Sequence, residues 1–520
     1  MENIESNFIK PIDRIVAVEG GMLLGVPAGD PAYTVFRGVP YAAAPVGQYR
    51  WRGAVPAEKW VGIRKCDVFP EISIQNKQVE GSFYQKEFFP GAVPMSEDCL
   101  FLNIWTPSTT GTDKLPILFW IHGGGFIGGY SHEREFDGEA FCRRGVILVT
   151  VGYRLGALGF FAHPELSVRS PFNISGNYAI TDCIQALKWV GSNIAAFGGD
   201  PSKITIFGQS AGGAMVQSLL ISPQAQGLFS RAIVQSAGGI NTLGNALTLK
   251  DAEDLGAKVC EWMGLSLDRL LEMDGAEVNS LINNALIEIK GVGLHFSPII
   301  DGCYQLKAAG AAIAAGEHHC VDIMTGSVSG DGVLFGGRLV GSVAEFKQDI
   351  IATYGEFATK YLELFGIESA DDLSAVLEAR RLAGSMLSSR SWAFAELKNK
   401  RKALYIYYFD RKMPGDDAGA FHAAELWYIF GTLDRCWRSM APGFDMRDYT
   451  LSRAMIDYWA NFAKTGDPNG ATVPEWPAFT RESPVTMYLS ESEIKAKDMA
   501  GDRITDGMVA LQLDAAFSDR

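Results

Sequence analysis

The fold is decided by the stretch Ile204-Thr205-Ile206-Phe207-Gly208-Gln209-Ser210-Ala211-Gly212-Gly213. Residues 204–207 predict a buried strand, and the largely apolar residues 211–221 predict a helix. A Gly-x-Ser-x-Gly motif between a strand and a helix is typical of a sharp turn that exposes a nucleophilic serine above a sheet. The glycines on either side of Ser210 permit that turn, because a β-carbon would obstruct it. We therefore predict that Ser210 is a nucleophile; the alternative is a tight turn that carries a serine by chance.

Short apolar strands and helices alternate on both sides of this stretch. We predict an amphipathic helix at 178–197 and strands at 115–121, 146–151, 204–207, 232–234, 321–324 and 404–409. This alternation predicts the α/β class, with a mostly parallel central sheet covered by helices on both faces. Such sheets bind ligands at the carboxyl ends of their strands. We expect a single domain over residues 1–520, with helical insertions at about 240–295 and 340–400.

The composition excludes several classes of protein. Of the 520 residues, 47% are hydrophobic and 20% are charged, which allows a large core and excludes a chain that is mainly disordered. The 60 acidic residues outnumber the 46 basic ones, and the formal charge of −14 disfavours nucleic acid as a partner. No apolar run reaches the ~18 residues expected of a membrane span.

The cysteines and the N-terminus bear on the compartment. The eight cysteines are scattered without a Cys-x-x-Cys pair, so we expect reduced and mostly buried thiols, although their spacing leaves disulfides open. The first residues have neither the basic start nor the apolar run of a secretory signal. Both observations predict a cytoplasmic protein.

A second glycine-rich loop, His122-Gly123-Gly124-Gly125-Phe126, follows the predicted strand at 115–121. Three glycines let the backbone come close to a ligand and point N–H groups at it. The amides of Gly124 and Gly125, with that of Ala211, could hold a developing oxyanion. One alternative is a dinucleotide fingerprint, but residues 131–135 do not begin a helix as that motif requires. The other is a purely structural loop.

An activated serine needs a histidine base and a carboxylate that orients it. His422 lies in a loop after the strand at 404–409, and Asp331 lies between two glycines after the strand at 321–324. The chain order Ser210, Asp331, His422 is the order that this topology requires. Asp331 could instead be a turn aspartate and His422 a polar residue at a helix entry. The run His318-His319-Cys320 suggests a metal, but neighbouring residues of a strand face opposite ways.

Together these residues resemble the type-B carboxylesterases, the cholinesterase/carboxylesterase group of α/β-hydrolases. The resemblance runs from about residue 12 to about residue 500. It rests on four segments in order: Phe36-Arg37-Gly38-Val39-Pro40-Tyr41-Ala42, Glu97-Asp98-Cys99-Leu100-Phe101-Leu102-Asn103-Ile104, Ile206-Phe207-Gly208-Gln209-Ser210-Ala211-Gly212-Gly213 and Phe421-His422-Ala423-Ala424-Glu425-Leu426.

The resemblance implies an α/β-hydrolase fold and a serine carboxylesterase that works through an acyl-enzyme without metal or organic cofactor. Ser210, Asp331 and His422 would form the catalytic triad, and Gly124, Gly125 and Ala211 the oxyanion hole. It also implies two structural ion pairs, Glu97 with Arg50 and Asp182 with Arg154. Non-catalytic adhesion proteins share the fold, and a peptidase or amidase activity is a further alternative.

Three departures from the family pattern affect the substrate and the compartment. Most members carry a glutamate where Asp331 stands, and aspartate is one methylene shorter. Gln209 replaces the glutamate of cholinesterases and Phe89 lies near their cation-binding tryptophan, which disfavours choline esters. Ser73 matches the upstream cysteine to which secreted relatives bridge Cys99, so Cys99 should be a free thiol.

The resemblance also implies a substrate pocket, in which Leu294 and Phe296 lie near the acyl group while Phe89, Phe126 and Gln209 line the gorge. Aromatic walls favour hydrophobic or aryl esters as the small-molecule substrate. The alternative is that the hydrophobic residues among them belong only to the core. The natural substrate and the oligomeric state are not encoded in any motif of the sequence.

Overall fold

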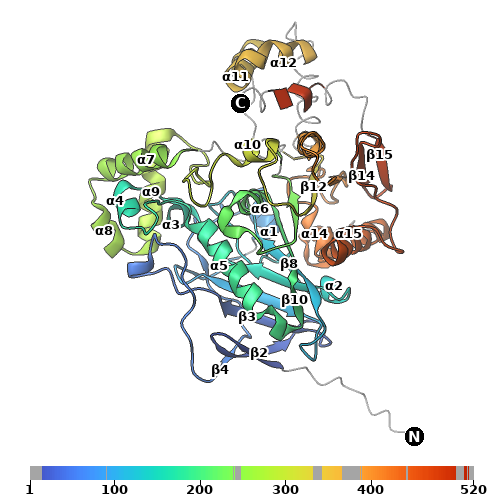
Figure 1. Cartoon of the computed structure of the whole chain (residues 1–520), viewed down its shortest axis with the longest axis horizontal. Helices are drawn as coiled ribbons and strands as arrows, with labels where there is room; N and C mark the ends of the chain where they lie inside the picture. Colours follow the sequence, from blue (N-terminus) through green and yellow to red (C-terminus); the bar gives the residue numbers. More distant parts are fainter. Residues whose placement is uncertain are drawn as a thin grey trace.

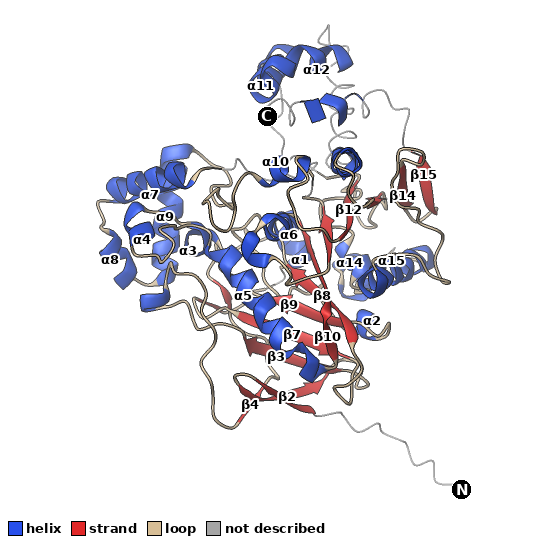
Figure 2. Cartoon of the chain, viewed as in Figure 1, coloured by secondary structure: helices blue, strands red, loops and turns tan. Residues whose placement is uncertain are grey.

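The computed structural model describes residues 14–89, 91–237, 239–240, 247–331, 342–365, 387, 389–440, 443–498, 507, 509–511 and 513–514. Within these residues a 13-stranded sheet runs through the molecule, with helices on both of its faces (Figure 1, Figure 2). Its strand order is β1-β2-β3-β7-β9-β8-β10-β11-β12-β13-β14-β15, and β4 pairs with β2. This is the predicted α/β architecture.

The centre of the sheet is parallel. The strands from β9 to β14 in this order pair in parallel: β9 (Ile147–Val151), β8 (Leu115–Ile121), β10 (Gly199–Gln209), β11 (Arg231–Gln235), β12 (Asp322–Val328), β13 (Tyr405–Phe409) and β14 (Val485–Leu489). All of them therefore end at the same edge of the sheet, where the predicted site residues follow β8, β10, β12 and β13.

Antiparallel strands extend the sheet at both sides. They are β1 (Arg14–Val18), β2 (Gly21–Pro27), β3 (Thr34–Pro40) and β7 (Phe101–Thr106) at one side and β15 (Ile494–Asp498) at the other. Strand β4 (Ile63–Lys65) pairs with β2, while β5 (Ile72–Ser73) and β6 (Met95–Ser96) form a separate small sheet. The sequence analysis did not predict these flanking strands.

Alternate residues of the central strands build two cores, as the two-residue period of a strand requires. In β8, Phe119 and Ile121 pack in one core with α5 (Tyr178–Asn193) and α6 (Ala211–Ile221). Leu118 and Trp120 pack in the other core with α14 (Leu426–Ile429) and α15 (Met446–Thr465). Both faces of the sheet are thus covered by helices, which explains why its strands are apolar throughout.

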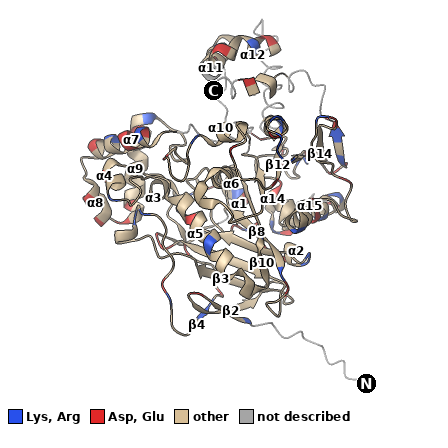
Figure 3. Ribbon diagram, in the orientation of Figure 1, with Lys and Arg blue, Asp and Glu red and all other residues tan. Residues whose placement is uncertain are grey.

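Further helices surround this frame. They are α1 (Phe83–Phe88), α2 (Glu139–Cys142), α3 (Gly156–Phe160), α4 (Pro164–Val168), α7 (Leu249–Met263), α8 (Leu267–Glu272), α9 (Gly275–Lys290), α10 (Ala309–Ala314), α11 (Val343–Tyr354) and α12 (Ala358–Phe365). Charged residues gather on outer helices such as α7, whereas β8 carries none (Figure 3). Helices α7 to α9 fall within the first predicted insertion and α11 and α12 within the second, part of which lies outside the described residues.

Both predicted ion pairs are confirmed. Arg50 and Glu97 meet at 2.6 Å, and so do the buried side chains of Arg154 and Asp182. All eight cysteines are free thiols, and burial raises the pKa of Cys99 to about 12 beside the Ser73 side chain. Among the described residues, none of the helices is both long and apolar enough to cross a membrane.

Candidate active site

Ser210 occupies a sharp turn between β10 and α6. Its backbone has φ 56°, a left-handed conformation that a non-glycine residue rarely adopts, and its side chain is almost buried. A β-carbon at Gly208 would lie 2.5 Å from the backbone of Gly212, and one at Gly212 would lie 2.0 Å from the Ile121 carbonyl oxygen. Both glycines are therefore required for the turn, as the sequence analysis argued.

The loops after β12 and β13 bring Asp331 and His422 together. Gly330 forms an isolated parallel bridge with Phe421, and its N–H donates to the Ala420 carbonyl at 2.9 Å. A β-carbon at Gly330 would lie 2.6 Å from that carbonyl oxygen, so glycine permits this approach of the two backbones. Asp331 Oδ1 lies within hydrogen-bonding distance of His422 Nδ1. The close approach of the loops explains how a side chain as short as aspartate reaches the imidazole.

The second ring nitrogen of His422 faces the turn that carries Ser210. His422 Nε2 lies 3.1 Å from the amide nitrogen of the buried Gln209 side chain. An amide nitrogen can only donate, so Nε2 accepts and the ring proton belongs to Nδ1, which donates it to Asp331. This tautomer leaves a lone pair on Nε2, which is the state that a general base needs. Gln209, which is predicted to line the substrate pocket, thus contacts the imidazole of His422.

Three backbone amides surround the turn with unused donors. The N–H groups of Gly124 and Gly125 donate no hydrogen bond to any described residue, and Ala211 is the first residue of α6, where a helix leaves its N–H groups unpaired. Gly124 and Gly125 have φ 101° and 64°. A β-carbon at the neighbouring Gly123 would lie 3.2 Å from Cβ of Ser210, so the loop abuts the turn. These donors can stabilise a negative oxygen near Ser210.

The predicted pocket residues divide into two groups. Leu294 is 62% exposed, and its side chain would lie 3.1 Å from a β-carbon at Gly125, which places it beside the glycine loop. Phe89 is half-buried, with its ring against Tyr130. Phe126 and Phe296, by contrast, are buried side chains of the main core, and Phe126 packs edge-on against Phe160. Leu294 is thus the best placed of the four hydrophobic side chains to contact a ligand at the loop.

The sequence analysis missed a buried carboxyl behind the histidine. Glu425 is fully buried and accepts a hydrogen bond from the Gln235 amide at 3.3 Å. Burial, and secondarily the charge of Asp331, raise the pKa of Glu425 to about 7. Its position three residues after His422 was visible in the sequence, but only the fold shows that its carboxyl group is buried.

His318 and His319 do not form a metal site. His318 Nε2 contacts the Glu396 carboxylate at 2.6 Å, whereas His319 Nε2 contacts the Ser222 carbonyl at 2.8 Å. Across the part of the chain that the structure describes, no group of three or more histidine, cysteine or acidic side chains could hold a metal ion.

Comparisons with known proteins agree on one family. Residues 12–504 match the profile of the carboxylesterase family. The chain is 34% identical to a fumonisin B1 esterase of Sphingopyxis macrogoltabida over 469 residues, which cover 88% of this chain and 83% of that protein. It is 32% identical to a para-nitrobenzyl esterase of Bacillus subtilis (strain 168), over 88% of this chain and 91% of that protein.

Solved structures show the same likeness. A thermophilic PNB esterase superposes with a TM-score of 0.82 at 28% identity, over 95% of this chain and 99% of that one. The Geobacillus stearothermophilus carboxylesterase EST55 superposes with a TM-score of 0.78 at 30% identity, over 95% and 99% of the two chains.

Proposed function

Because the chain belongs to the carboxylesterase family and is a carboxylic ester hydrolase of the α/β-hydrolase fold, we propose that Ser210, His422 and Asp331 are its catalytic triad. The observation that carries this proposal is the hydrogen bonding of His422. Its Nδ1 faces Asp331, and its Nε2 lies 3.1 Å from the side-chain amide of Gln209, the residue directly before Ser210.

The reaction follows from these positions. His422 Nε2 takes the hydroxyl proton of Ser210 while the serine oxygen attacks the acyl carbonyl carbon. The amides of Gly124, Gly125 and Ala211 hold the oxyanion, and Asp331 stabilises the imidazolium. His422 then gives its proton to the leaving alcohol, and an acyl-serine remains. Water repeats the two steps, which releases the acid and restores the serine. No metal or organic cofactor takes part in this scheme.

We further propose that the substrates are hydrophobic or aryl esters. Leu294 beside the glycine loop supplies an apolar contact for an acyl or aryl group. Gln209 is neutral, so the site lacks the carboxylate that would attract a quaternary ammonium group at this position. The names of the similar proteins, a fumonisin B1 esterase and a para-nitrobenzyl esterase, are compatible with large or aromatic esters.

The test is a rate panel over p-nitrophenyl esters from acetyl to dodecanoyl, with Ser210→Ala as the control. We expect turnover with the wild type and a loss of about 10⁶-fold in kcat with the variant, whose thermal unfolding should be unchanged. A fluorophosphonate should label the wild-type serine alone. Retained turnover in Ser210→Ala would overturn the assignment of the nucleophile.

We also propose that the chain folds as a single domain and that it is located in the cytoplasm. The main sheet uses strands from residue 14 to residue 498, which supports a single domain. The eight free thiols support a cytoplasmic location, because disulfides are usual in oxidising compartments. Limited proteolysis tests the first proposal, since one domain should give no stable half-length fragment. Fractionation of cells tests the second.

A further inference from the structure

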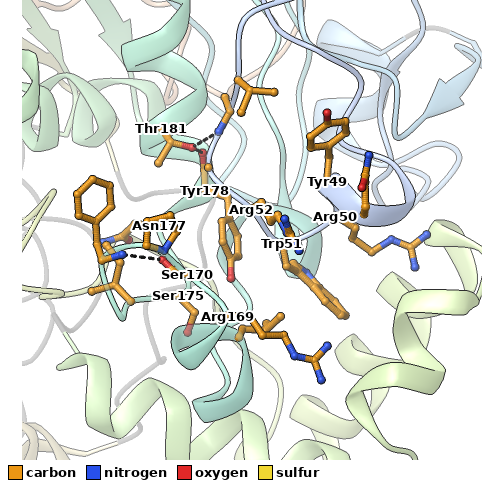
Figure 4. A pocket seen from close by; sticks show the side chains of 18 of the residues that line it. Tyr49, Arg50, Trp51, Arg52, Arg169, Ser170, Ser175, Asn177, Tyr178 and Thr181 are labelled. Carbon is orange, nitrogen blue, oxygen red and sulfur yellow. Dashed lines mark hydrogen bonds between the residues drawn. The ribbon is translucent and has the colours of Figure 1, made fainter.

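A cavity of about 540 Å³ lies outside the candidate active site (Figure 4). One wall is the segment 47–55, and the opposite side is formed by residues 169–175 and the first turns of α5. Leu166 of α4, Leu271 and Glu272 of α8, and Tyr304 complete it, and no residue of the proposed triad or oxyanion hole lines it. Its size is within the range of pockets that bind small molecules.

The lining is largely apolar and aromatic. Trp51, Leu166 and Tyr178 are buried residues at the cavity, and Tyr304 is half-buried. Phe172 is 58% exposed and contacts the Tyr304 ring edge-on at 6.4 Å. A large aromatic side chain left exposed beside a cavity keeps apolar surface in water, which a bound apolar group would cover.

Two polar side chains of the cavity floor are hydrogen-bonded within the protein, whereas the buried Tyr178 hydroxyl has no hydrogen-bond partner among the described residues. Thr181 donates to the Tyr178 carbonyl at 2.6 Å and accepts from the Ala54 N–H at 3.0 Å. The Asn177 amide bonds Asp301 at 2.8 Å as well as both backbone polar groups of Ile299. Apart from the Tyr178 hydroxyl, the floor therefore offers a ligand van der Waals contact and little hydrogen bonding.

Arg52 is the exception among the charged groups of the cavity. Arg50 is paired with Glu97, and Arg169 is paired with Asp268 at 2.8 Å. The one carboxylate of the lining, Glu272, is paired with Arg269 at 3.4 Å. Arg52 is exposed and has neither an ion pair nor a side-chain hydrogen bond with any described residue. Its planar guanidinium presents several donors in the arrangement that a carboxylate accepts. The cavity thus combines an apolar interior with one uncommitted cation.

We propose that this cavity is a second ligand site that binds an amphipathic carboxylate. The apolar body lies against Trp51, Tyr178 and Phe172, and the carboxylate pairs with Arg52. This is the chemical class of the acid that hydrolysis of a hydrophobic ester releases, so the acid product itself fits the site. The inference does not depend on the triad assignment, because the cavity and the triad share no residue.

The probes are decanoate and its neutral analogue decanol, titrated calorimetrically into the full chain after treatment with a small organophosphate that blocks a reactive serine. We expect saturable binding of decanoate. Arg52→Gln should raise the Kd for decanoate about tenfold, the loss expected for one charged hydrogen bond, and should leave the Kd for decanol unchanged. The matched control is Arg64→Gln, an exposed arginine of the same N-terminal region that lies over Trp60, and it should bind as the wild type does.

A second variant fills the cavity. Gly53 lines it, and a β-carbon there would contact Thr181 at an ordinary 3.8 Å, so Gly53→Trp directs an indole toward the cavity without a backbone clash. It should abolish binding of both probes, while turnover of p-nitrophenyl acetate by untreated protein reports that the fold is kept. Should treated wild type bind no decanoate, or should Arg52→Gln and Gly53→Trp bind it as the wild type does, the proposal is wrong. Because the serine is blocked beforehand, failure here leaves the triad assignment unaffected.

Discussion

Two histidine–carboxylate pairs lie in different parts of the described structure, and they differ in what surrounds the imidazole. In the pair of His422 and Asp331, Nδ1 faces the carboxylate while Nε2 accepts from Gln209 beside Ser210. In the pair of His318 and Glu396, Nε2 faces the carboxylate at 2.6 Å while Nδ1 lies 3.0 Å from the His319 carbonyl. His318 Nδ1 also lies 3.3 Å from Arg401 Nη2, so the second nitrogen of that ring is enclosed by a structural arginine, whereas the second nitrogen of His422 lies beside the turn of Ser210.

The difference separates a proton-transfer pair from a structural one. Glu396 also accepts from Trp392 at 3.2 Å and from Arg401 at 3.3 Å, so its carboxylate is enclosed by donors. Asp331 remains 18% exposed, and the ring that it orients lies next to the turn of Ser210. A histidine and a carboxylate in contact therefore do not identify a catalytic site; what distinguishes the two pairs is the group beside the second ring nitrogen, Arg401 for His318 and the turn of Ser210 for His422.

The largest effect is expected from removing the first imidazole. His422→Gln should lower kcat/KM for p-nitrophenyl butyrate by about 10⁶-fold, because no other group can take the serine proton. The midpoint of thermal unfolding should change little. His318→Gln is the matched control, and it should lose stability but keep the turnover of the folded fraction. Equal losses of turnover in the two variants would erase the distinction between the pairs.

The carboxylate of the same pair comes next. Asp331→Asn should lower kcat by about 10⁴-fold, since an amide can donate to Nδ1 and so favours the wrong tautomer. Asp331→Glu keeps the carboxylate but lengthens the side chain by one methylene. Its kcat should lie between that of Asp331→Asn and that of the wild type. Stopped-flow measurement of acyl-enzyme formation checks both variants. A rate for Asp331→Asn within tenfold of wild type would show that another group orients the imidazole.

Substitutions in the pair of His318 and Glu396 should change the stability of the protein and not its kcat. Glu396→Gln leaves His318 and Arg401 beside a neutral amide, and breaking a buried ion pair typically costs about 3–5 kcal/mol. The expected result is a lower midpoint in urea with kcat unchanged for the protein that remains folded. Lys402→Gln removes an exposed cation nearby and is the control. A fall in kcat without a lower midpoint would indicate a catalytic contribution from this pair.

A third set of buried carboxyls has no cation at all within the described residues. Glu133 and Glu135 lie together, and the oxygens of Glu135 have no hydrogen-bond donor there unless one carboxyl is protonated. Burial raises the pKa of Glu133 from 4.5 to about 7 and that of Glu135 well above its usual value.

The sign follows from proton linkage. Between pH 4.5 and about 7 the unfolded chain has lost these protons while the folded chain retains them, so the free energy of unfolding falls as the pH rises. Glu135→Gln should reduce the fall in the free energy of unfolding between pH 5 and 8 by roughly 2 kcal/mol. Glutamine has no carboxyl proton to lose, and its amide can donate a hydrogen bond to Glu133. Urea midpoints from pH 5 to 8 check it, with Glu356→Gln as a surface control. If the urea midpoint of Glu135→Gln fell with pH as steeply as that of the wild type, the pair would not hold a proton in the folded state.

Local sequence was sufficient for much of this molecule. The apolar run 115–121 is β8 with no change of bounds, and the helix at 211–221 is α6 likewise. The helix expected at 178–197 ends at Asn193 and continues as a 3₁₀ turn to Phe197, which keeps the same apolar face. The flanking strand β1 was not predicted, although four of its five residues, Ile15 to Val18, form an apolar run in the sequence.

Local sequence patterns specify the order of the parts: a strand, a glycine-bounded Ser210 and a helix, followed by an aspartate and a histidine after later strands. Those features depend on residues that are near neighbours in the chain, so periodicity and steric size predict them. Which of these side chains come into contact depends on the folded arrangement of the strands. The contact of Asp331 with His422 spans 91 residues and that of Gln209 with His422 spans 213. Such contacts exist because parallel strands end at one edge of the sheet, a relation that no local pattern contains.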